Sequence, residues 1–338
     1  MKPTIRDVAK LANVSISTVS RVMNAPDTVV EEKRIRVQQA ILALNYQPNA
    51  LARGLISKKS NTFGVLLPDI KNTYYNGVLR GMGDAAKDHG YSLMICNTYR
   101  DKESIVGYFE MFYEKQIDGV IFMSDRIYPD YYEIIQRLDM KLVLASTHSL
   151  EYDIPSVKVN DEQASFDAVD YLAKLGHRGI GMISFPLADP IAGLTRYNGF
   201  LRAMRAHGLA YGEPAVEFTE DSIWFEDGYE AAERLFAKHP ELTAVFAASD
   251  ELALGAISYL QDAGVPVPGR VSVVGFDNLR LSGMSSPRLT TVAQPVYDIG
   301  YRAVRKLWEV TYEGATSPLR EYLPHELVVR QSAAPWQP

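Results

Sequence analysis

The chain has 338 residues, of which 47% are hydrophobic, 22% charged and 10% aromatic. This length predicts two or three folded units, and the composition is that of an ordinary globular protein. Disorder, collagen and coiled coil are therefore excluded as descriptions of the whole chain. The longest apolar runs, such as residues 64–67 and 119–123, are far shorter than the roughly 20 residues that cross a bilayer.

The start of the chain carries no basic-then-apolar leader, so we expect neither secretion by a signal peptide nor a membrane anchor. The single cysteine, Cys96, cannot form an internal disulfide and fits a reducing compartment. Because it lies in an apolar run, we interpret it as a small core residue. Together these features predict a cytoplasmic protein.

The net charge of −6 hides a strong asymmetry along the chain. Residues 1–60 hold ten Lys and Arg against four Asp and Glu, whereas the remaining residues hold 25 against 37. A small basic head on a large acidic body is typical of a nucleic-acid-binding unit attached to another domain.

The head shows the pattern of a helix-turn-helix. Thr4 and Asp7 form a capping pair at the start of a first helix, and Asn13 is a residue that tolerates the left-handed turn that ends one. Ser15 caps a second helix over 16–23, and a third helix over 31–44 closes the core, with these residues predicted on its buried face: Ile35, Ala40, Ile41 and Leu44. We assign residues 1–47 to this domain.

The outward face of the second helix suits a DNA major groove. Its side chains are short, and Arg21 can form two hydrogen bonds with a guanine edge. The predicted contacts on this face are Ser15, Ile16, Ser17, Ser20 and Arg21. The alternative is a small helical bundle whose polar face is merely solvated.

Three segments resemble the signature of the LacI/GalR transcriptional regulators: residues 4–10, 14–24 and 46–55. The first two form the helix-turn-helix, and the third matches the hinge of that family. The sequence departs from the family pattern at Asn13, where glycine is usual, and at Val30, where a capping hydroxyl is usual. The resemblance adds these DNA-contact residues: Thr4, Asn24, Tyr46, Asn49, Ala52 and Leu55.

The hinge, residues 48–60, is short and interrupted by Gly54, so an isolated helix there would be marginally stable. In the family, the leucine that matches Leu55 is a wedge that enters the minor groove and kinks the operator. The alternative is that Leu55 packs on the body.

From Asn61 onward, strand and helix patterns alternate in two successive series, which predicts an α/β body of parallel sheets. The resemblance implies a periplasmic-binding-protein type I fold with two subdomains. We assign residues 61–160 and 293–320 to the N-terminal subdomain, and 161–292 and 321–332 to the C-terminal one. A ligand cleft is expected at the carboxyl ends of the strands.

Polar and aromatic residues at those strand ends predict an effector site for a small sugar or sugar phosphate. Arg196 and Asp277 resemble the family's ligand-binding Arg and Asp, and the cleft aromatic matches Ile223 or Trp224. The full set is Asp69, Tyr74, Tyr75, Asn160, Arg196, Ile223, Trp224, Ser249 and Asp277.

An enzyme is not expected. The six histidines have no metal-ligand spacing, and the chain has neither a nucleophile elbow nor a P-loop. We therefore predict no catalytic residues, no metal and no cofactor. The remaining alternative to a regulator is a solute-binding receptor, which the helix-turn-helix argues against.

Residues 155–169 and 278–305 resemble the catabolite control branch of the family, whose corepressor is the phosphocarrier protein HPr phosphorylated on a serine. The positions that match its docking site are Arg80, Tyr297, Asp298 and Arg305. Residues 76–79 and 83–84 depart from the usual helix, so a local sugar-responsive repressor is the alternative. We expect a homodimer on a near-palindromic operator, and residues 332–338 lack the heptads of a tetramer-forming tail.

Overall fold

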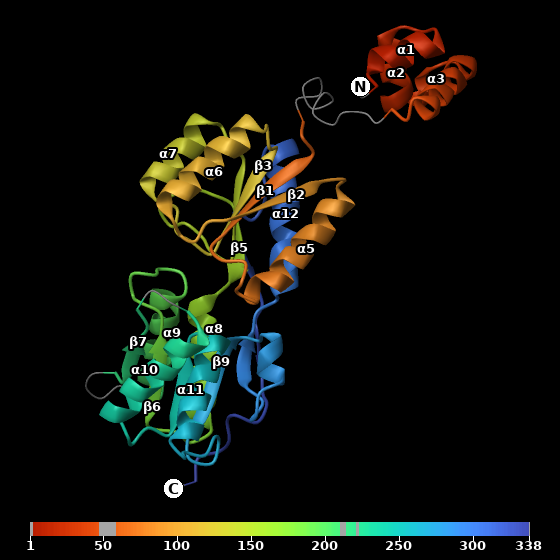
Figure 1. The fold of residues 1–338 in the computed structure, drawn as a ribbon. Coiled ribbons are helices and arrows are strands. Elements are labelled where there is room, and N and C mark those ends of the chain that lie inside the picture. Colours follow the sequence, from red (N-terminus) through yellow and green to blue (C-terminus); the bar gives the residue numbers. More distant parts are fainter. Residues whose placement is uncertain (1–2, 47–58, 210–213, 221–222, 338) are drawn as a thin grey trace. The chain divides into compact units, whose positions relative to one another are not determined.

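The computed structural model describes residues 3–46, 59–209, 214–220 and 223–337. The chain divides into two compact units, Met1–Ser60 and Asn61–Pro338 (Figure 1). Within the described residues, no helix is both long and apolar enough to cross a membrane.

The first unit is a three-helix head. Its core is formed by small and β-branched side chains, among them Val8, Val19 and Val37, which are inaccessible to solvent. Ile35 was predicted on the buried face of the third helix, but it is 43% exposed. The buried residues of this helix are Ala40, as predicted, and Val37, which was not predicted. The helices are α1 (Ile5–Ala12), α2 (Ile16–Asn24) and α3 (Glu31–Ala43), with a short 3-10 turn, η1 (Pro26–Thr28), between the last two.

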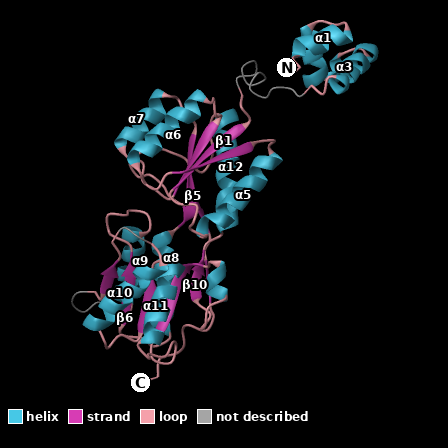
Figure 2. Ribbon diagram, viewed as in Figure 1, coloured by secondary structure: helices cyan, strands magenta, loops and turns pink. Residues whose placement is uncertain are grey.

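The second unit contains two six-stranded sheets, each covered by helices on both faces (Figure 2). In the first sheet the strand order is β11-β5-β4-β3-β1-β2, and all neighbours are parallel. The strands are β1 (Thr62–Leu67), β2 (Ser92–Asn97), β3 (Gly119–Met123), β4 (Leu142–Ala145), β5 (Ser156–Val159) and β11 (Arg320–Leu323).

The two faces of the first sheet follow the period-two alternation of a strand. Val65 and Leu67 of β1 face one core cluster, whereas Leu66 belongs to another. Helices α5 (Tyr74–Asp88) and α12 (Val296–Tyr312) cover the first face, and α6 (Lys102–Glu114) and α7 (Pro129–Arg137) cover the second. Buried strands of this kind need apolar residues on both sides, which explains the continuous apolar runs of the sequence.

The second sheet has the order β12-β10-β9-β8-β6-β7, in which only β12 is antiparallel to its neighbour. Its strands are β6 (Ile180–Ser184), β7 (Val216–Phe218), β8 (Ala244–Ala247), β9 (Ser272–Asp277), β10 (Thr290–Ala293) and β12 (Glu326–Val328). Its helices are α8 (Asp161–Lys174), α9 (Gly193–Ala206), α10 (Phe225–Lys238) and α11 (Asp250–Asp262), with a 3-10 turn η2 (Arg280–Gly283). The predicted architecture of a helical head and a body with parallel sheets is confirmed.

The chain passes between the two sheets three times, after β5, after β10 and after β11. The last passage differs from the prediction, which placed the boundary at residue 320. Strand β11 continues in the first sheet to Leu323, because it pairs in parallel with β5 along Ser156–Val159. The three crossings define the two subdomains, one around each sheet.

The C-terminal tail packs against the second subdomain. The backbone N–H of Trp336 donates a hydrogen bond to the carbonyl of Leu175 at 2.8 Å. The buried ring of His177 contacts Thr243, Ser272 and the carbonyl of Ala334 at 2.9, 3.0 and 3.1 Å. His177 therefore has the structural role that its position before a strand suggested.

Candidate functional site

The turn between α1 and α2 is fixed by two side chains of the predicted kind. Asn13 ends α1 with a left-handed backbone, at φ 50° and ψ 53°. The hydroxyl of Ser15 accepts a hydrogen bond from the backbone N–H of Thr18 at 3.2 Å and so caps α2. Val30, in contrast, begins α3 without a side-chain cap, as its departure from the family pattern predicted.

The outer face of α2 carries short polar side chains and one guanidinium. Ile16 is 44% exposed, Ser17 and Arg21 are exposed, and Ser20 is half-buried. Thr4 is exposed beside the start of α1, and its hydroxyl donates to Asp7 at 2.7 Å. Tyr46 packs against the head core. The side chain of Asn24 and the residues Asn49, Ala52 and Leu55 lie outside the described residues.

A buried guanidinium lies at the centre of the second unit, where the two subdomains meet. Arg196 of α9 donates to Asp161 from Nε at 3.0 Å and from Nη2 at 2.9 Å. Its Nη1 donates to the carbonyl of Ala248 at 2.5 Å, and its guanidinium lies 3.7 Å from the centre of the Phe276 ring. These contacts fix the orientation of a charged group that can form paired hydrogen bonds.

Asp161 also binds a second buried cation. The Nζ of Lys158 lies 2.8 Å from Asp161, and the side chains are only 3% and 4% exposed. Burial acts to raise the pKa of Asp161, but the charges of Lys158 and Arg196 outweigh it, and the pKa is below its ordinary value. Asp161 is therefore an ionised carboxylate between two buried cations.

Asp277, at the end of β9, is a second carboxylate near Arg196. Its Oδ1 lies 4.0 Å from Arg196 and accepts a hydrogen bond from the amide of Gln294 at 2.7 Å. Burial, opposed by Arg196, raises the pKa of Asp277 to about 7. Its backbone is left-handed, with φ 117°, which is unfavourable for a residue with a Cβ. Such strain at a strand end is typical of residues held in place for binding.

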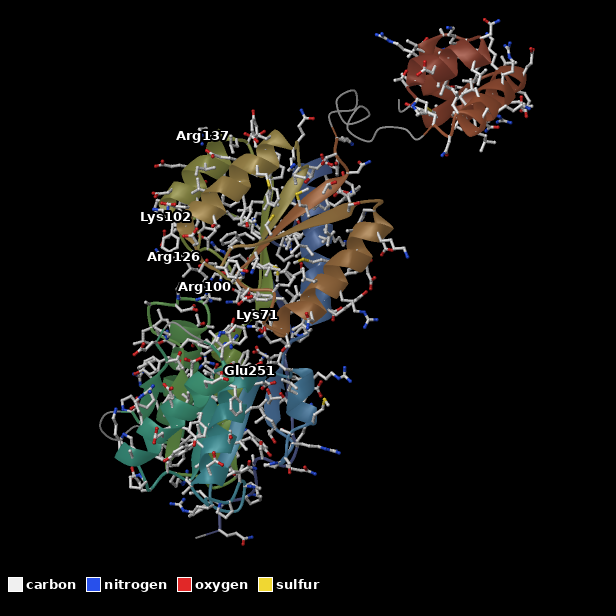
Figure 3. All side chains as sticks on the ribbon, in the orientation of Figure 1. Lys71, Arg100, Lys102, Arg126, Arg137 and Glu251 are labelled. Atoms are coloured by element: carbon white, nitrogen blue, oxygen red, sulfur yellow. The ribbon has the colours of Figure 1, made fainter. Side chains whose placement is uncertain are left out.

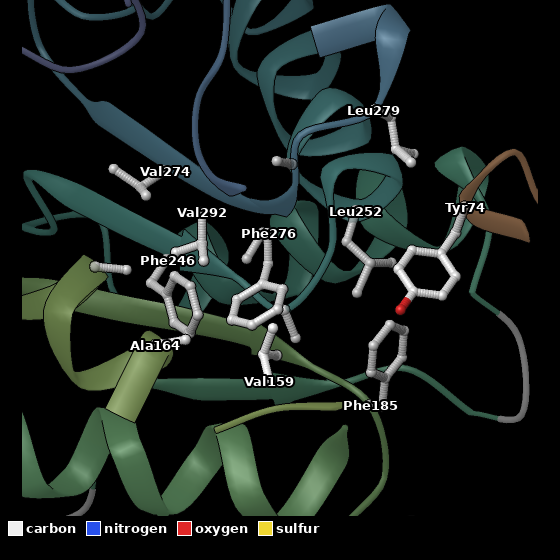
Figure 4. Close-up of a cluster of buried hydrophobic side chains, with 14 of the residues drawn as sticks. Tyr74, Val159, Ala164, Phe185, Phe246, Leu252, Val274, Phe276, Leu279 and Val292 are labelled. Carbon is white, nitrogen blue, oxygen red and sulfur yellow. The ribbon is translucent and has the colours of Figure 1, made fainter. Parts of the chain in front are cut away.

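The first subdomain contributes aromatic side chains from the start of α5. The hydroxyls of Tyr74 and Ser146 lie 2.8 Å apart, and the Tyr74 hydroxyl also donates to Gln294 at 3.3 Å. Tyr74 lies beside Phe185, which follows β6 in the second subdomain (Figure 4). Aromatic rings and hydrogen-bonding groups from both subdomains thus surround one cavity.

The cavity has a volume of about 80 Å³, and we call it the central cavity. Its lining includes six of the predicted effector residues: Tyr74, Tyr75, Arg196, Ile223, Ser249 and Asp277. Asp69 and Trp224 line a neighbouring cavity of about 180 Å³, which shares Asn72, Tyr75, Arg100 and Ile223 with it. Between the two candidates for the cleft aromatic position, Ile223 is the one at the central cavity.

Asn160 does not line the central cavity. Its side chain caps α8 by accepting a hydrogen bond from the N–H of Gln163 at 3.1 Å, and it lines a different cavity. The next residue, Asp161, lines the central cavity and forms the ion pair with Arg196. Asn160 is the N-cap of α8, where its side chain is used for the cap, and Asp161 is the first residue of that helix and is buried.

Several lining residues escaped the sequence analysis. Arg100 follows β2 and Asp189 follows β6, so the rule that ligands bind at carboxyl ends of strands could have found both. Lys158 lies inside the short strand β5 and carried no such signal. Figure 3 shows Arg100 and Glu251 where the two subdomains face one another.

The predicted corepressor positions lie on the joint outer face of α5 and α12. The helices approach closely, since a Cβ on Gly81 would lie 2.0 Å from the carbonyl oxygen of Tyr297. The hydroxyl of Tyr297 donates to Asp84 at 3.1 Å. Arg80 and Asp298 are exposed. Arg305 is 54% exposed and forms an ion pair with Glu309, with Nε and Oε1 3.2 Å apart.

The sequence matches two protein-family models. The model described as bacterial regulatory proteins, lacI family, covers residues 4–49. The model described as periplasmic binding protein-like domain covers residues 169–333. Catabolite control protein A of Priestia megaterium is 39% identical over 332 residues, which are 98% of this chain and 99% of that protein. The chain belongs to the lacI family.

Two solved structures of regulators extend the comparison. The Lac repressor dimer bound to operator and the anti-inducer ONPF is 25% identical with a TM-score of 0.90, over 99% of this chain and 100% of that one. The complex of the regulator CelR with cellobiose is 28% identical with a TM-score of 0.75, over 98% and 100%. This lacI-family protein is therefore a DNA-binding transcriptional regulator, and the relatives named here are regulators rather than enzymes.

Proposed function

We propose that the protein is an operator-binding repressor of carbon metabolism whose affinity for DNA is controlled by a sugar bound in the central cavity. The observation that carries this proposal is the buried group of Arg196, Asp161 and Asp277 between the two subdomains. A guanidinium and carboxylates beside aromatic rings are suited to the hydroxyl groups and apolar faces of a sugar ring. The similarity to CelR, whose complex contains cellobiose, supports the same ligand class.

A ligand in the central cavity contacts both subdomains. Tyr74 comes from the first and Arg196 from the second, so ligand binding favours one arrangement of the two over others. If DNA binding depends on that arrangement, the affinity for operator must change when the sugar binds.

We also propose that the protein acts as a homodimer. A single short helix such as α2 contacts too few base pairs for specificity, and two copies on a near-palindromic operator solve this problem. The similarity to a Lac repressor dimer on operator DNA supports this state.

A second candidate is global catabolite control with serine-phosphorylated HPr as corepressor. The similarity to catabolite control protein A and the exposed Arg80 favour it, since a guanidinium binds phosphate through paired hydrogen bonds. The surface also carries Asp84 and Asp298, both exposed, and Arg305 is already paired with Glu309. Docking of a phosphate there must therefore compete with neighbouring carboxylates.

The two candidates are separated by one experiment. An operator is first selected from a random duplex pool, and the dissociation constant of the full chain is then measured by fluorescence anisotropy at fixed salt. Neutral sugars, sugar phosphates, HPr and serine-phosphorylated HPr are added in turn. A sugar that changes the dissociation constant at least fivefold, and loses the effect in Arg196→Lys, supports control through the cavity. Enhancement by phosphorylated HPr alone supports catabolite control, and selection of no operator contradicts both.

A further inference from the structure

A second cavity continues the central one toward the solvent. It has a volume of about 210 Å³, and we call it the outer cavity. Six lining residues are common to both cavities: Arg100, Ser124, Phe185, Asp189, Ile191 and Ile223. Because so much of their lining is shared, the two cavities form one elongated cleft with a deep and an outer end.

The outer cavity has apolar surface from both subdomains. Tyr128 belongs to the first subdomain and is 44% exposed; it forms an edge-to-face pair with Tyr131, with ring centres 5.4 Å apart and planes at 87°, and the Arg126 guanidinium lies 5.5 Å from the centre of its ring. Pro186 and Pro190 come from the second subdomain, and proline restricts its backbone. An aromatic ring from one subdomain and rigid apolar residues from the other give the cavity surfaces suited to the apolar faces of a sugar ring.

Polar groups are placed around this apolar surface. The carboxylate of Asp189 accepts hydrogen bonds from the N–H groups of Ile191 and Ala192 at 2.8 and 3.0 Å, which fixes its position. Arg100 lies 3.8 Å from the other oxygen of Asp189, which is longer than a hydrogen bond. The guanidinium of Arg100 can therefore donate hydrogen bonds to the hydroxyl groups of a ligand, and the carboxylate of Asp189 can accept hydrogen bonds from them.

The charges along the cleft argue against a phosphate ester. The basic side chains of the two linings are Arg100, Arg126, Lys158 and Arg196. The acidic side chains are more numerous: Asp125, Asp161, Asp189, Glu220, Glu251 and Asp277. Arg126 is moreover paired with Glu151, at 2.5 Å, and Lys158 with Asp161. A doubly charged phosphate would therefore meet no excess of positive charge, whereas a neutral ligand is unaffected.

We propose that the outer cavity is a subsite for the second ring of a neutral disaccharide or longer saccharide, whose first ring occupies the central cavity. Tyr128 is the specificity-determining residue of this subsite, through contact with the second ring. The inference rests on the proposed function, since it requires a sugar in the central cavity.

The test is isothermal titration calorimetry of the full chain. The probes are the neutral disaccharides cellobiose, maltose, lactose, sucrose and trehalose, the monosaccharides glucose, galactose and fructose, and glucose 6-phosphate. We expect at least one disaccharide to bind at least tenfold more tightly than any of its component monosaccharides and than glucose 6-phosphate. In Tyr128→Ala, the ratio of the monosaccharide dissociation constant to that of the disaccharide falls to less than threefold.

Two further variants control this result. Tyr113→Ala removes a tyrosine that is 57% exposed on α6 and lines neither cavity, and it keeps the ratio of the natural chain. Glu220→Gln changes a residue of the second subdomain that lines the outer cavity, and we expect it also to lower the ratio of monosaccharide to disaccharide dissociation constants. This second variant tests the subsite even if Tyr128→Ala fails to fold. Monosaccharides that bind as tightly as every disaccharide, or tighter binding of glucose 6-phosphate, would overturn the subsite alone. Binding of no sugar at all would overturn the proposed function as well.

Discussion

Replacement of Asp161 by alanine removes the carboxylate that two buried cations share. Lys158 lies 2.8 Å from it, and Arg196 lies 2.9 Å from it through Nη2, with all three side chains at most 7% exposed. A buried ion pair that loses one partner leaves an uncompensated charge, which costs about 3–5 kcal/mol. We therefore expect Asp161→Ala to lower the free energy of unfolding of the second unit by at least about 3 kcal/mol.

Urea unfolding followed by tryptophan fluorescence measures this loss directly. The three tryptophans, Trp224, Trp308 and Trp336, all lie in the second unit, so the head does not contribute to the signal. The matched control is Glu162→Gln on the same helix, because Glu162 forms an ion pair with Arg202 in which both side chains are more than 40% exposed. An exposed pair of this kind contributes less than about 1 kcal/mol.

The comparison of the two variants decides the matter. If Asp161→Ala lowers the free energy of unfolding no more than Glu162→Gln does, Asp161 is not coupled to Lys158 and Arg196 as the short distances indicate, and its contacts do not fix the Arg196 guanidinium in the central cavity. A double variant with Lys158→Met tests the same reasoning, since it removes one of the two stranded cations and should recover part of the loss.

Four other outcomes follow from the structure and the family. Arg21→Ala should weaken operator binding by about 1–3 kcal/mol while non-specific binding changes little, as measured by anisotropy on operator and random duplexes. Leu55→Ala should also weaken specific binding more than non-specific binding, and equal losses would argue against a minor-groove wedge. Arg305→Ala should abolish most of any enhancement by serine-phosphorylated HPr, and calorimetry against both forms of HPr would show no change if Arg305 only pairs with Glu309. Burial raises the pKa of Asp277 to about 7, so the folded protein retains a proton that the unfolded chain releases near pH 4. The free energy of unfolding should therefore fall as the pH rises from about 4 to about 7, and Asp277→Asn should flatten this slope in urea titrations at several pH values.

The head could be predicted from sequence almost completely, because its signals are local. A left-handed Asn13 and a capping Ser15 act within a few residues of themselves, and the structure contains both features. Ile35 shows what helical periodicity cannot decide. Ile35 and Val37 are both apolar residues of α3, and packing against the other two helices buries Val37 and leaves Ile35 43% exposed. Helix propensity and the spacing of apolar residues do not determine which of the two side chains is buried.

The body was predictable in its long strands and less so in its short ones. Strands β5, β7 and β11 have three or four residues and include charged side chains, so they lack the apolar runs of β1 or β3. Lys158 is buried because Asp161 and His148 lie within 3.3 Å of its Nζ, and no window of sequence around it indicates this. The ends of the strands indicated where the central cavity lies, but the burial of Asp161 at the start of α8 depends on its contacts with Lys158 and Arg196, which the local sequence does not show.

The order in which the chain is synthesised gives the crossed connections a further consequence. Helix α12 and strand β11 complete the first subdomain, yet they come from residues 296–323, near the end of the chain. Until they leave the ribosome, the buried faces of Val78 and Met82 on α5 lack the partner that contributes Ile299 and Val304. At a synthesis rate of about 5–20 residues per second, the nascent chain exposes this apolar face for many seconds, a period in which chaperones or proteases can bind it. A chain that ends prematurely before Val296 never covers it, so truncated products should be removed rather than accumulate as inactive repressor.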